Sequence, residues 1–174
     1  MAEESDVSIG DDTEREEAML TAARSVVRTC MQIRPHEHVL VVTDPTTSEV
    51  GRSLYEAASE VTDRILMMMM PRRHRQGNEP PASVGDLMRR QNVVMLATRH
   101  SLTHTGARLR ASREGARIAS MPGINEEMLA VGGMTADYNA LQKEISGLNP
   151  MLRRRRDVRG WCPWNPKTVP HTSH

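Results

Sequence analysis

The sequence contains no phenylalanine, and only two tryptophans and two tyrosines occur among its 174 residues. The core therefore cannot be built around aromatic rings, and Val, Leu, Ile, Ala and 13 Met must fill it. Methionine adapts to irregular space, so we expect a core that packs well but specifies its geometry weakly. Cysteine is also scarce, because only Cys30 and Cys162 occur, far apart and in unlike contexts. This usage favours a reducing compartment over a disulfide framework.

Strong net charge and long apolar runs are absent too. The formal net charge of +1 argues against a dedicated nucleic-acid-binding protein, which needs a surplus of Lys and Arg on one face. The opening residues MAEESDVSIGDDTEREE are acidic and polar, the reverse of a secretory signal, and no apolar run approaches 18 residues. We therefore expect a cytoplasmic protein that binds neither nucleic acid nor a membrane.

Short apolar segments alternate with segments of helical periodicity. The β-branched run from Val39 to Val42 is typical of a strand buried on both faces of a parallel sheet. We predict strands at 39–42, 65–70, 93–97 and 117–120, and helices at 13–33, 46–61, 83–90, 106–114, after Gly123, and at 134–148. This alternation indicates right-handed βαβ crossovers. The predicted fold class is α/β, a Rossmann-like, mainly parallel sheet of about four strands with helices on both faces.

The polarity of the two ends predicts the domain organisation. Residues 1–12 should be a disordered leader, after which Thr13 and Glu16 have the spacing of a capping box. The Rossmann-like domain then spans 13–150. Residues 151–174 carry five Arg and one Lys against one Asp. This basic tail is either a disordered segment that binds an acidic partner or the product of a frame change.

Polar residues follow the first predicted strand, where a helix begins. Asp44, Thr46 and Thr47 stand at the carboxyl end of that strand, a place where open α/β sheets bind ligands. No glycine occurs between the strand and Gly51, so neither a dinucleotide fingerprint nor a P-loop is present. Two interpretations remain open. The hydroxyls cap the helix, with Thr46 and Glu49 as a capping box, or they contact a ligand.

The loop after the third strand reads HSLTHT and carries two imidazoles with hydroxyls between them. His100 and His104 could share a metal if the segment were helical, but we predict a loop, and no third ligand is suggested nearby. The favoured ligand-binding interpretation is a single imidazole, that of His104, which faces a cleft beside Ser101 and Thr103. The alternative is an exposed loop histidine beside capping threonines.

A third polar motif, MPGINEEM, places Glu126 and Glu127 in the first turn of a helix. Paired carboxylates can bind metal or act as acid and base. Adjacent helical residues point about 100° apart, however, and rarely serve one centre together. We therefore favour an interaction of both carboxylates with the helix dipole.

Four motifs, in this order and spacing, resemble the N-terminal domain of the aminopeptidase T family of metallopeptidases. They are VLVVTDPTTSEVGRSLYEAA, PRRHRQGNEPP, SLTHT and GARIASMPGINEEML, and the resemblance runs from about Glu17 to Arg159. It implies one half of a bilobal, dimeric, cytoplasmic exopeptidase that releases N-terminal residues from peptides at a two-metal site of zinc or cobalt. A relative of similar architecture is the iron-dependent 2,5-dihydroxypyridine dioxygenase, so these motifs alone do not fix the reaction.

The resemblance also has gaps. The metal ligands of the family, a set of Glu, His, Tyr and Asp residues, lie in its C-terminal domain, and this sequence has no positions that match them. We therefore predict no metal ligand, no cofactor and no catalytic residue on this chain. His36, Val61 and Thr62 depart from the family pattern in two turns, and His100 is not part of the family motif, although His104 is.

Two hypotheses of different classes follow. In the first, the chain is the N-terminal lobe of an aminopeptidase-like metalloenzyme, forms one wall of the peptide cleft, self-associates as a homo-oligomer and is inactive alone. In the second, it is a freestanding Rossmann-like module that uses loops 44–48 and 101–105 to hold a small anion or a peptide end.

Overall fold

The computed structural model describes residues 8–131, 140–141 and 143–146. The chain divides into two units, Met1–Ala136 and Asp137–His174. In the second unit, residues 140–141 and 143–146 are helical, and the rest of the predicted helix 134–148 lies outside the described residues, as does the tail 151–174. Within the described part of the chain, every helix is too short or too polar to cross a bilayer.

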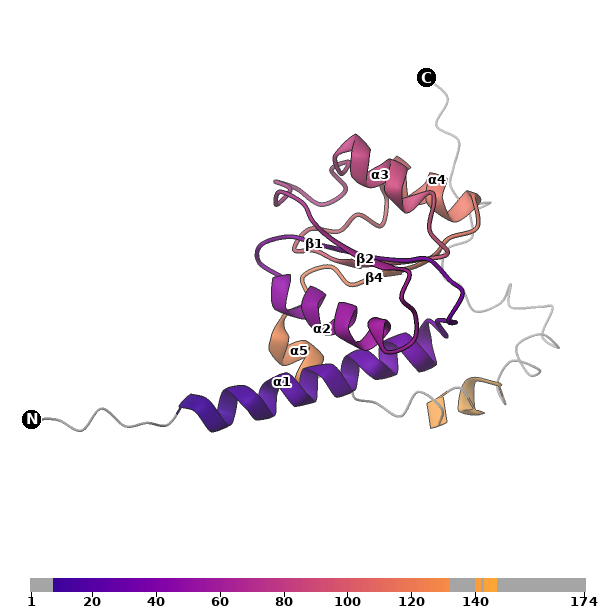
Figure 1. Cartoon of the computed structure of the whole chain (residues 1–174). Coiled ribbons are helices and arrows are strands. Elements are labelled where there is room, and N and C mark those ends of the chain that lie inside the picture. Colours follow the sequence, from indigo (N-terminus) through magenta and orange to yellow (C-terminus); the bar gives the residue numbers. More distant parts are fainter. Residues whose placement is uncertain (1–7, 132–139, 142, 147–174) are drawn as a thin grey trace, which may run out of the picture. The chain divides into compact units, whose positions relative to one another are not determined.

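Four strands form one parallel sheet in the order β2-β1-β3-β4 (Figure 1). The strands are β1 (Val39–Thr43), β2 (Ile65–Met69), β3 (Val93–Ala97) and β4 (Arg117–Ser120). Val39 at the start of β1 pairs with Ile65 on one side and with Val93 on the other. β1 and β3 are completely buried, which explains their continuous apolar sequences. The predicted α/β fold is confirmed.

Helices cover both faces of this sheet (Figure 1). On one face lie α1 (Ser8–Ser25) with its π-helical continuation Val26–Cys30, α2 (Ser48–Ser59) and α5 (Glu126–Ala130), and on the other lie α3 (Ala82–Met88) and α4 (Gly106–Arg113). Side chains alternate along β1, so Val39 and Val41 join the core under α1, α2 and α5, while Leu40 and Val42 join the core under α3 and α4.

The strand at one edge of the sheet is much less covered. β2 pairs only with β1 within the described residues, and Ile65 is its one buried residue. Leu66 is 53% exposed and Met69 is 52% exposed, although both belong to an apolar strand. An exposed apolar edge strand is a surface on which another chain can pair.

The first helix begins earlier than predicted. It starts at Ser8, within the segment predicted to be disordered, and Thr13 lies inside the helix instead of capping it. Two exposed ion pairs of Arg15 lie near this end of the helix. Arg15 binds Asp12 at 2.7 Å one turn away and lies 3.4 Å from the Glu126 carboxylate of α5. Residues 1–7 lie outside the described part of the chain.

The predicted capping box at the second helix is also wrong. α2 has Thr47 as its N-cap residue, and the Thr47 side chain makes no capping hydrogen bond. The hydroxyl of Thr46 is 2.6 Å from a carboxylate oxygen of Asp44 and donates its hydrogen bond there. The Thr46 hydroxyl therefore binds Asp44, which precedes the helix, instead of capping α2.

Candidate functional site

The carboxyl ends of β1 and β3 lie next to each other at the point where the connections diverge. From β1 the chain passes through α2 to β2, its neighbour on one side, and from β2 it crosses through α3 on the opposite face to β3, the neighbour on the other side. Loops at such a switch point separate instead of covering each other, and this opening is where open α/β sheets place their ligands.

Asp44 follows β1 and is buried, with only 1% of its surface exposed. One carboxylate oxygen accepts from the backbone and hydroxyl of Thr46, at 2.9 and 2.6 Å, and the other accepts from the Arg99 backbone at 2.7 Å. Burial acts to raise the pKa of Asp44, but these hydrogen bonds and the charge of Arg72 outweigh it and lower the pKa. Asp44 therefore braces two loops as an ionised carboxylate, and a direct contact with a ligand stays a prediction.

The two threonines after Asp44 have different surroundings. Thr47 is buried, and its hydroxyl donates to the Ala97 carbonyl of β3 at 2.6 Å and lies 2.9 Å from the Thr43 hydroxyl. Its side chain thus ties the end of β1 to the end of β3. Thr46 is exposed and lines a small pocket of about 140 Å³ at the start of α2. Of the two predicted hydroxyls, that of Thr46 is the accessible one.

The loop after β3 contains a short chain of hydroxyls. The Ser101 hydroxyl donates to that of Thr103 at 2.8 Å, and the Thr103 hydroxyl lies 2.7 Å from that of Ser120. Ser120 ends β4, so these contacts join the loop to the next strand. The sequence predicted Ser101 and Thr103 but not Ser120, whose polar side chain at a strand's carboxyl end was the available signal.

The loop after β2 reaches across the end of β1 to the loop after β3. The Gly77 amide donates to the Ser101 carbonyl at 2.8 Å, and the Gln76 side chain accepts from the Ser101 amide. The Glu79 carboxylate accepts from the Gly106 and Ala107 amides, which open α4. The start of α4 is therefore already occupied by a carboxylate, and the loops after β1, β2 and β3 form one connected polar surface.

The two histidines of the third loop differ in exposure. α4 begins only at Gly106, so the prediction that this segment is a loop is confirmed. His104 is exposed and makes no hydrogen bond with any described residue, whereas His100 is half-buried. Across the described residues, no three His, Cys, Asp or Glu side chains are grouped so that they could hold a metal ion. A cleft-facing role for His104 stays a prediction.

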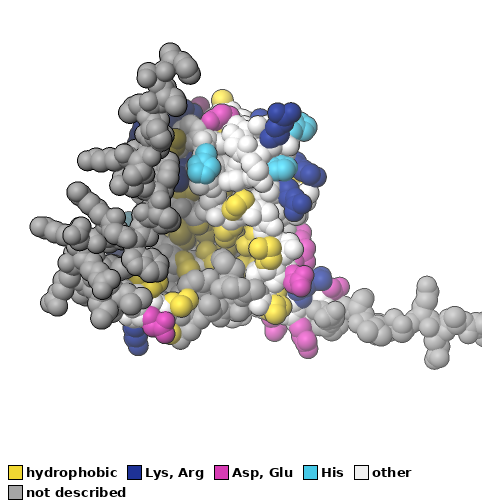
Figure 2. All heavy atoms as spheres, turned by 180° about the vertical axis from the view of Figure 1, so that it is seen from behind, with side chains coloured by type: hydrophobic (Ala, Val, Ile, Leu, Met, Phe, Trp, Pro, Cys, Tyr) yellow, Lys and Arg dark blue, Asp and Glu magenta, His cyan; other side chains and the backbone are white. Residues whose placement is uncertain are grey.

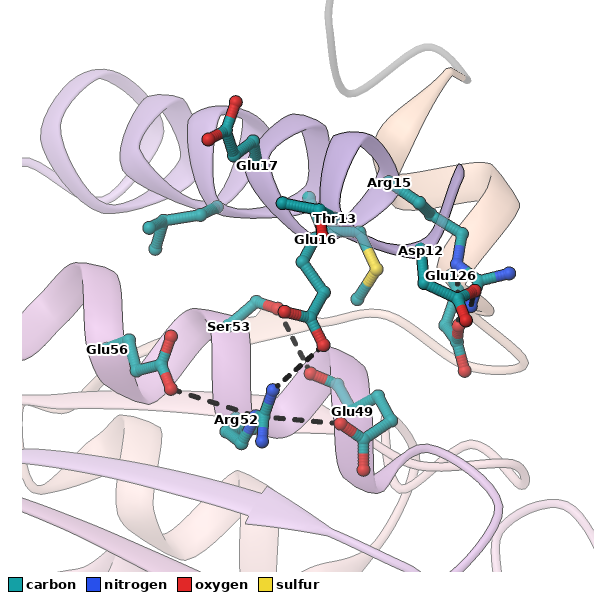
Figure 3. A pocket seen from close by; sticks show the side chains of 12 residues that line it. Asp12, Thr13, Arg15, Glu16, Glu17, Glu49, Arg52, Ser53, Glu56 and Glu126 are labelled. Carbon is teal, nitrogen blue, oxygen red and sulfur yellow. Dashed lines mark hydrogen bonds and ion pairs between the residues drawn. The ribbon is translucent and has the colours of Figure 1, made fainter. Parts of the chain in front are cut away.

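A separate hollow of about 420 Å³ lies between α1, α2 and α5 (Figure 3). Arg52 of α2 lines it and lies 3.3 Å from Glu16, 3.5 Å from Glu49 and 3.7 Å from Glu56. All four side chains are more than half exposed, so these pairs are solvated and each contributes at most about 1 kcal/mol. This hollow is an ion-paired helix surface.

The third motif occupies the position predicted for it. Glu126 and Glu127 lie in the first turn of α5, where the helix dipole favours negative charge, and Asn125 caps the helix by accepting from the Met128 amide at 2.7 Å. Glu126 also faces Arg15, and its carboxylate lines the pocket at the start of α2.

No protein-family model matches this sequence, and no curated protein matches it. Among solved structures, the chain is similar to 2,5-dihydroxypyridine dioxygenase from Pseudomonas putida, with a TM-score of 0.52 and 12% sequence identity. The similarity covers 62% of this chain and 35% of the dioxygenase, so the chain spans about a third of that protein's length. At this level of identity the likeness concerns the fold.

Proposed function

We propose that this chain is the N-terminal lobe of a bilobal metalloenzyme, and that the carboxyl edge of its sheet forms one wall of the substrate cleft. A second lobe would supply the metal, and we assign no metal ligand and no catalytic residue to the chain itself. Alone, it would bind at most part of a substrate and turn none over. By its motif resemblance, the enzyme would be an aminopeptidase that removes N-terminal residues from peptides.

The observation that carries this proposal is the bracing of three loops into one surface at the switch point of the sheet. Asp44 and Thr47 connect the ends of β1 and β3, and Ser101 connects the loops after β2 and β3. Surfaces of this kind hold polar groups in fixed positions, as a substrate-binding wall requires. Thr46 and His104 are the exposed candidates for contact with a substrate.

A second reaction is favoured by the structural similarity. A dioxygenase that acts on 2,5-dihydroxypyridine contains a region of similar fold over 35% of its length. In this version the chain is the corresponding lobe of a dioxygenase-like metalloenzyme, and the same edge would face a dihydroxypyridine. The two versions share the role of this lobe and differ in the partner lobe and its metal.

Complementation tests the proposal and separates its two versions. The full chain is mixed with the C-terminal lobe of an aminopeptidase T family protein, and release of p-nitroaniline from a leucyl reporter is measured with zinc or cobalt. In parallel, the chain is mixed with the C-terminal region of the dioxygenase and iron(II), and the absorbance of 2,5-dihydroxypyridine is followed. We expect no turnover by the chain alone and metal-dependent turnover with one of the two partners.

Matched histidine variants show whether the proposed wall takes part. In the complemented enzyme, His104→Ala should lower kcat/KM about tenfold or more, because it removes a polar group from the cleft. His38→Ala makes the same change at an exposed site before β1, at the opposite edge of the sheet, and should leave kcat/KM unchanged. If neither partner lobe becomes more active on adding the chain, the proposal is wrong.

A further inference from the structure

A further hollow, lined by basic side chains, lies at the carboxyl edge of the sheet. Its volume is about 310 Å³, and it is lined by Arg72, Arg73 and His74 from the loop after β2 and by His100 from the loop after β3. Figure 2 shows Lys or Arg and His side chains gathered on the side of the molecule where, in Figure 1, the loops after β1 and β2 lie. Two loops far apart in sequence thus place four nitrogen-bearing side chains around one space.

Two polar atoms of this lining are buried without a partner. The Nε of Arg73 and the Nδ1 of His100 are shielded from solvent, yet neither forms a hydrogen bond within the described part of the protein. Buried polar groups are nearly always paired, and leaving one unpaired costs about 1–3 kcal/mol. Both atoms belong to residues that line the hollow, so a small movement of these side chains would bring the Arg73 donor to an acceptor held there.

The nearby carboxylates neutralise the hollow only in part. Asp44 is ionised and close enough for the charge of Arg72 to lower its pKa, but its two oxygens are occupied by hydrogen bonds from Thr46 and from the Arg99 amide and form no ion pair with Arg72 or Arg73. Glu79, the acidic residue of the loop after β2, caps α4. Within the described residues, neither Arg72 nor Arg73 forms an ion pair. The hollow therefore keeps a local positive charge in a protein whose formal net charge is only +1.

We propose that this hollow is an oxyanion-binding site. The guanidinium of Arg73 would donate through its buried Nε and a terminal nitrogen to two oxygens of one carboxylate or phosphate group, the geometry in which arginine binds such anions best. His100 would donate a further hydrogen bond from Nδ1, and Arg72 would add charge. Binding requires only this chain, so it does not depend on the proposed partner lobe.

Calorimetric titration of the full chain at low ionic strength tests this proposal with three probes: sulfate, phosphate and acetate. We expect saturable one-site binding with a Kd of about 1 mM or tighter for at least one probe. Tighter binding of sulfate and phosphate than of acetate assigns the site to a tetrahedral oxyanion, and the reverse order assigns it to a carboxylate. If none of the three probes binds saturably, the proposal is wrong.

Two arginine variants distinguish a built site from general attraction. Arg73→Gln should raise the Kd about tenfold or more. Arg75→Gln removes the same charge from an exposed position two residues away and should change the Kd less than about threefold. Circular dichroism checks that each variant is folded. Arg72→Gln alters an exposed lining residue and provides a second test should Arg73→Gln not fold. If the Arg73 and Arg75 variants raise the Kd equally, the anion is attracted by general positive charge and the proposal of a specific site is wrong.

Discussion

Among the ion pairs of the described residues, the one between Glu37 and Arg117 has the least exposed carboxylate, and it lies at the amino edge of the sheet. Glu37 is only 7% exposed, and its two oxygens lie 2.8 and 2.9 Å from the two terminal nitrogens of Arg117. The Arg34 amide donates to the same carboxylate at 2.9 Å. The hydrogen bonds from the Arg117 side chain, helped by the Arg34 amide and opposed by burial, lower the pKa of Glu37 to about 2. This pair joins the turn before β1 to β4.

Arg117→Ala should destabilise the protein by about 2 kcal/mol at pH 7, because it leaves a buried carboxylate without its partner. The pKa of Glu37 is lower in the folded state than the value of about 4.3 expected when unfolded, so the stabilisation is complete above about pH 5. The stabilisation by this ion pair is lost as the pH falls from about 5 through the folded pKa of about 2. Urea unfolding at pH 7, 5 and 3 measures the free energy of unfolding of variant and parent. The difference between them should be roughly half as large at pH 3 as at pH 7.

An exposed pair provides the control for this measurement. Arg89 lies 2.7 Å from Glu114, but both side chains are more than two-fifths exposed. Arg89→Ala should thus change the free energy of unfolding by no more than about 0.5 kcal/mol at any of these pH values. A destabilisation by Arg117→Ala that is the same at pH 7 and pH 3 would contradict the linkage to Glu37.

The sequence predicted the residues of the carboxyl edge better than it predicted their partners. Asp44, Thr47 and Ser101 do lie at that edge, because residues that follow parallel strands must end there. The bonds of Gln76 and Glu79 to the loop and helix after β3 could not be predicted, because their partners are 25 or more residues away in sequence. Only the order of the strands brings such groups together.

At the scale of elements, α2 packs against β1 at unusually close range. A Cβ atom added at Gly51 would lie 2.9 Å from the Cβ of Thr43, closer than real Cβ contacts. Thr43 is fully buried and its hydroxyl is held near that of Thr47, so it has little freedom to move. Glycine at position 51 therefore sets the distance between the helix and the central strand.

Gly51→Ala should destabilise the protein by about 2 kcal/mol, because overpacking a rigid contact outweighs the gain in helix propensity of about 1 kcal/mol. Ser59→Ala, at an exposed position of the same helix, should stay within about 0.5 kcal/mol of the parent. Chemical denaturation measures both changes. Increased stability of Gly51→Ala would show that the helix can move away from the strand, and our account of this contact would be wrong.

Strands were predicted more accurately than the starts of helices. The predicted strands at 93–97 and 117–120 match β3 and β4. For β3 the reason is that its continuous apolar run reflects burial on both faces of the sheet. The two capping boxes were misleading, since α1 begins before Thr13 and the Thr46 hydroxyl is bound by Asp44. At α2 the competing contact is itself local, because Asp44 lies only two residues before Thr46, and the spacing of a capping box does not show that the hydroxyl binds this carboxylate.

At the scale of the whole molecule, self-association remains a prediction. The exposed apolar side chains of β2, at Leu66, Met67 and Met69, provide a surface for it. We expect the mass measured by light scattering to rise with concentration, and the double variant Leu66→Lys/Met69→Lys to reduce that rise. Leu109→Lys changes an apolar residue on α4 that is 43% exposed and serves as the control. A constant monomer mass at all concentrations would contradict the prediction.

The all-parallel order of the sheet has a consequence for folding kinetics. No two strands of this sheet can form a hairpin, and Val39 must meet Val93 before the central pair exists. Closing a loop of this length costs conformational entropy before the strand contacts that offset it have formed. The transition state for folding must therefore bring together segments that are distant in sequence. We therefore expect folding to be slow for a domain of this size. During synthesis, β1 cannot pair with β3 until β3 has left the ribosome.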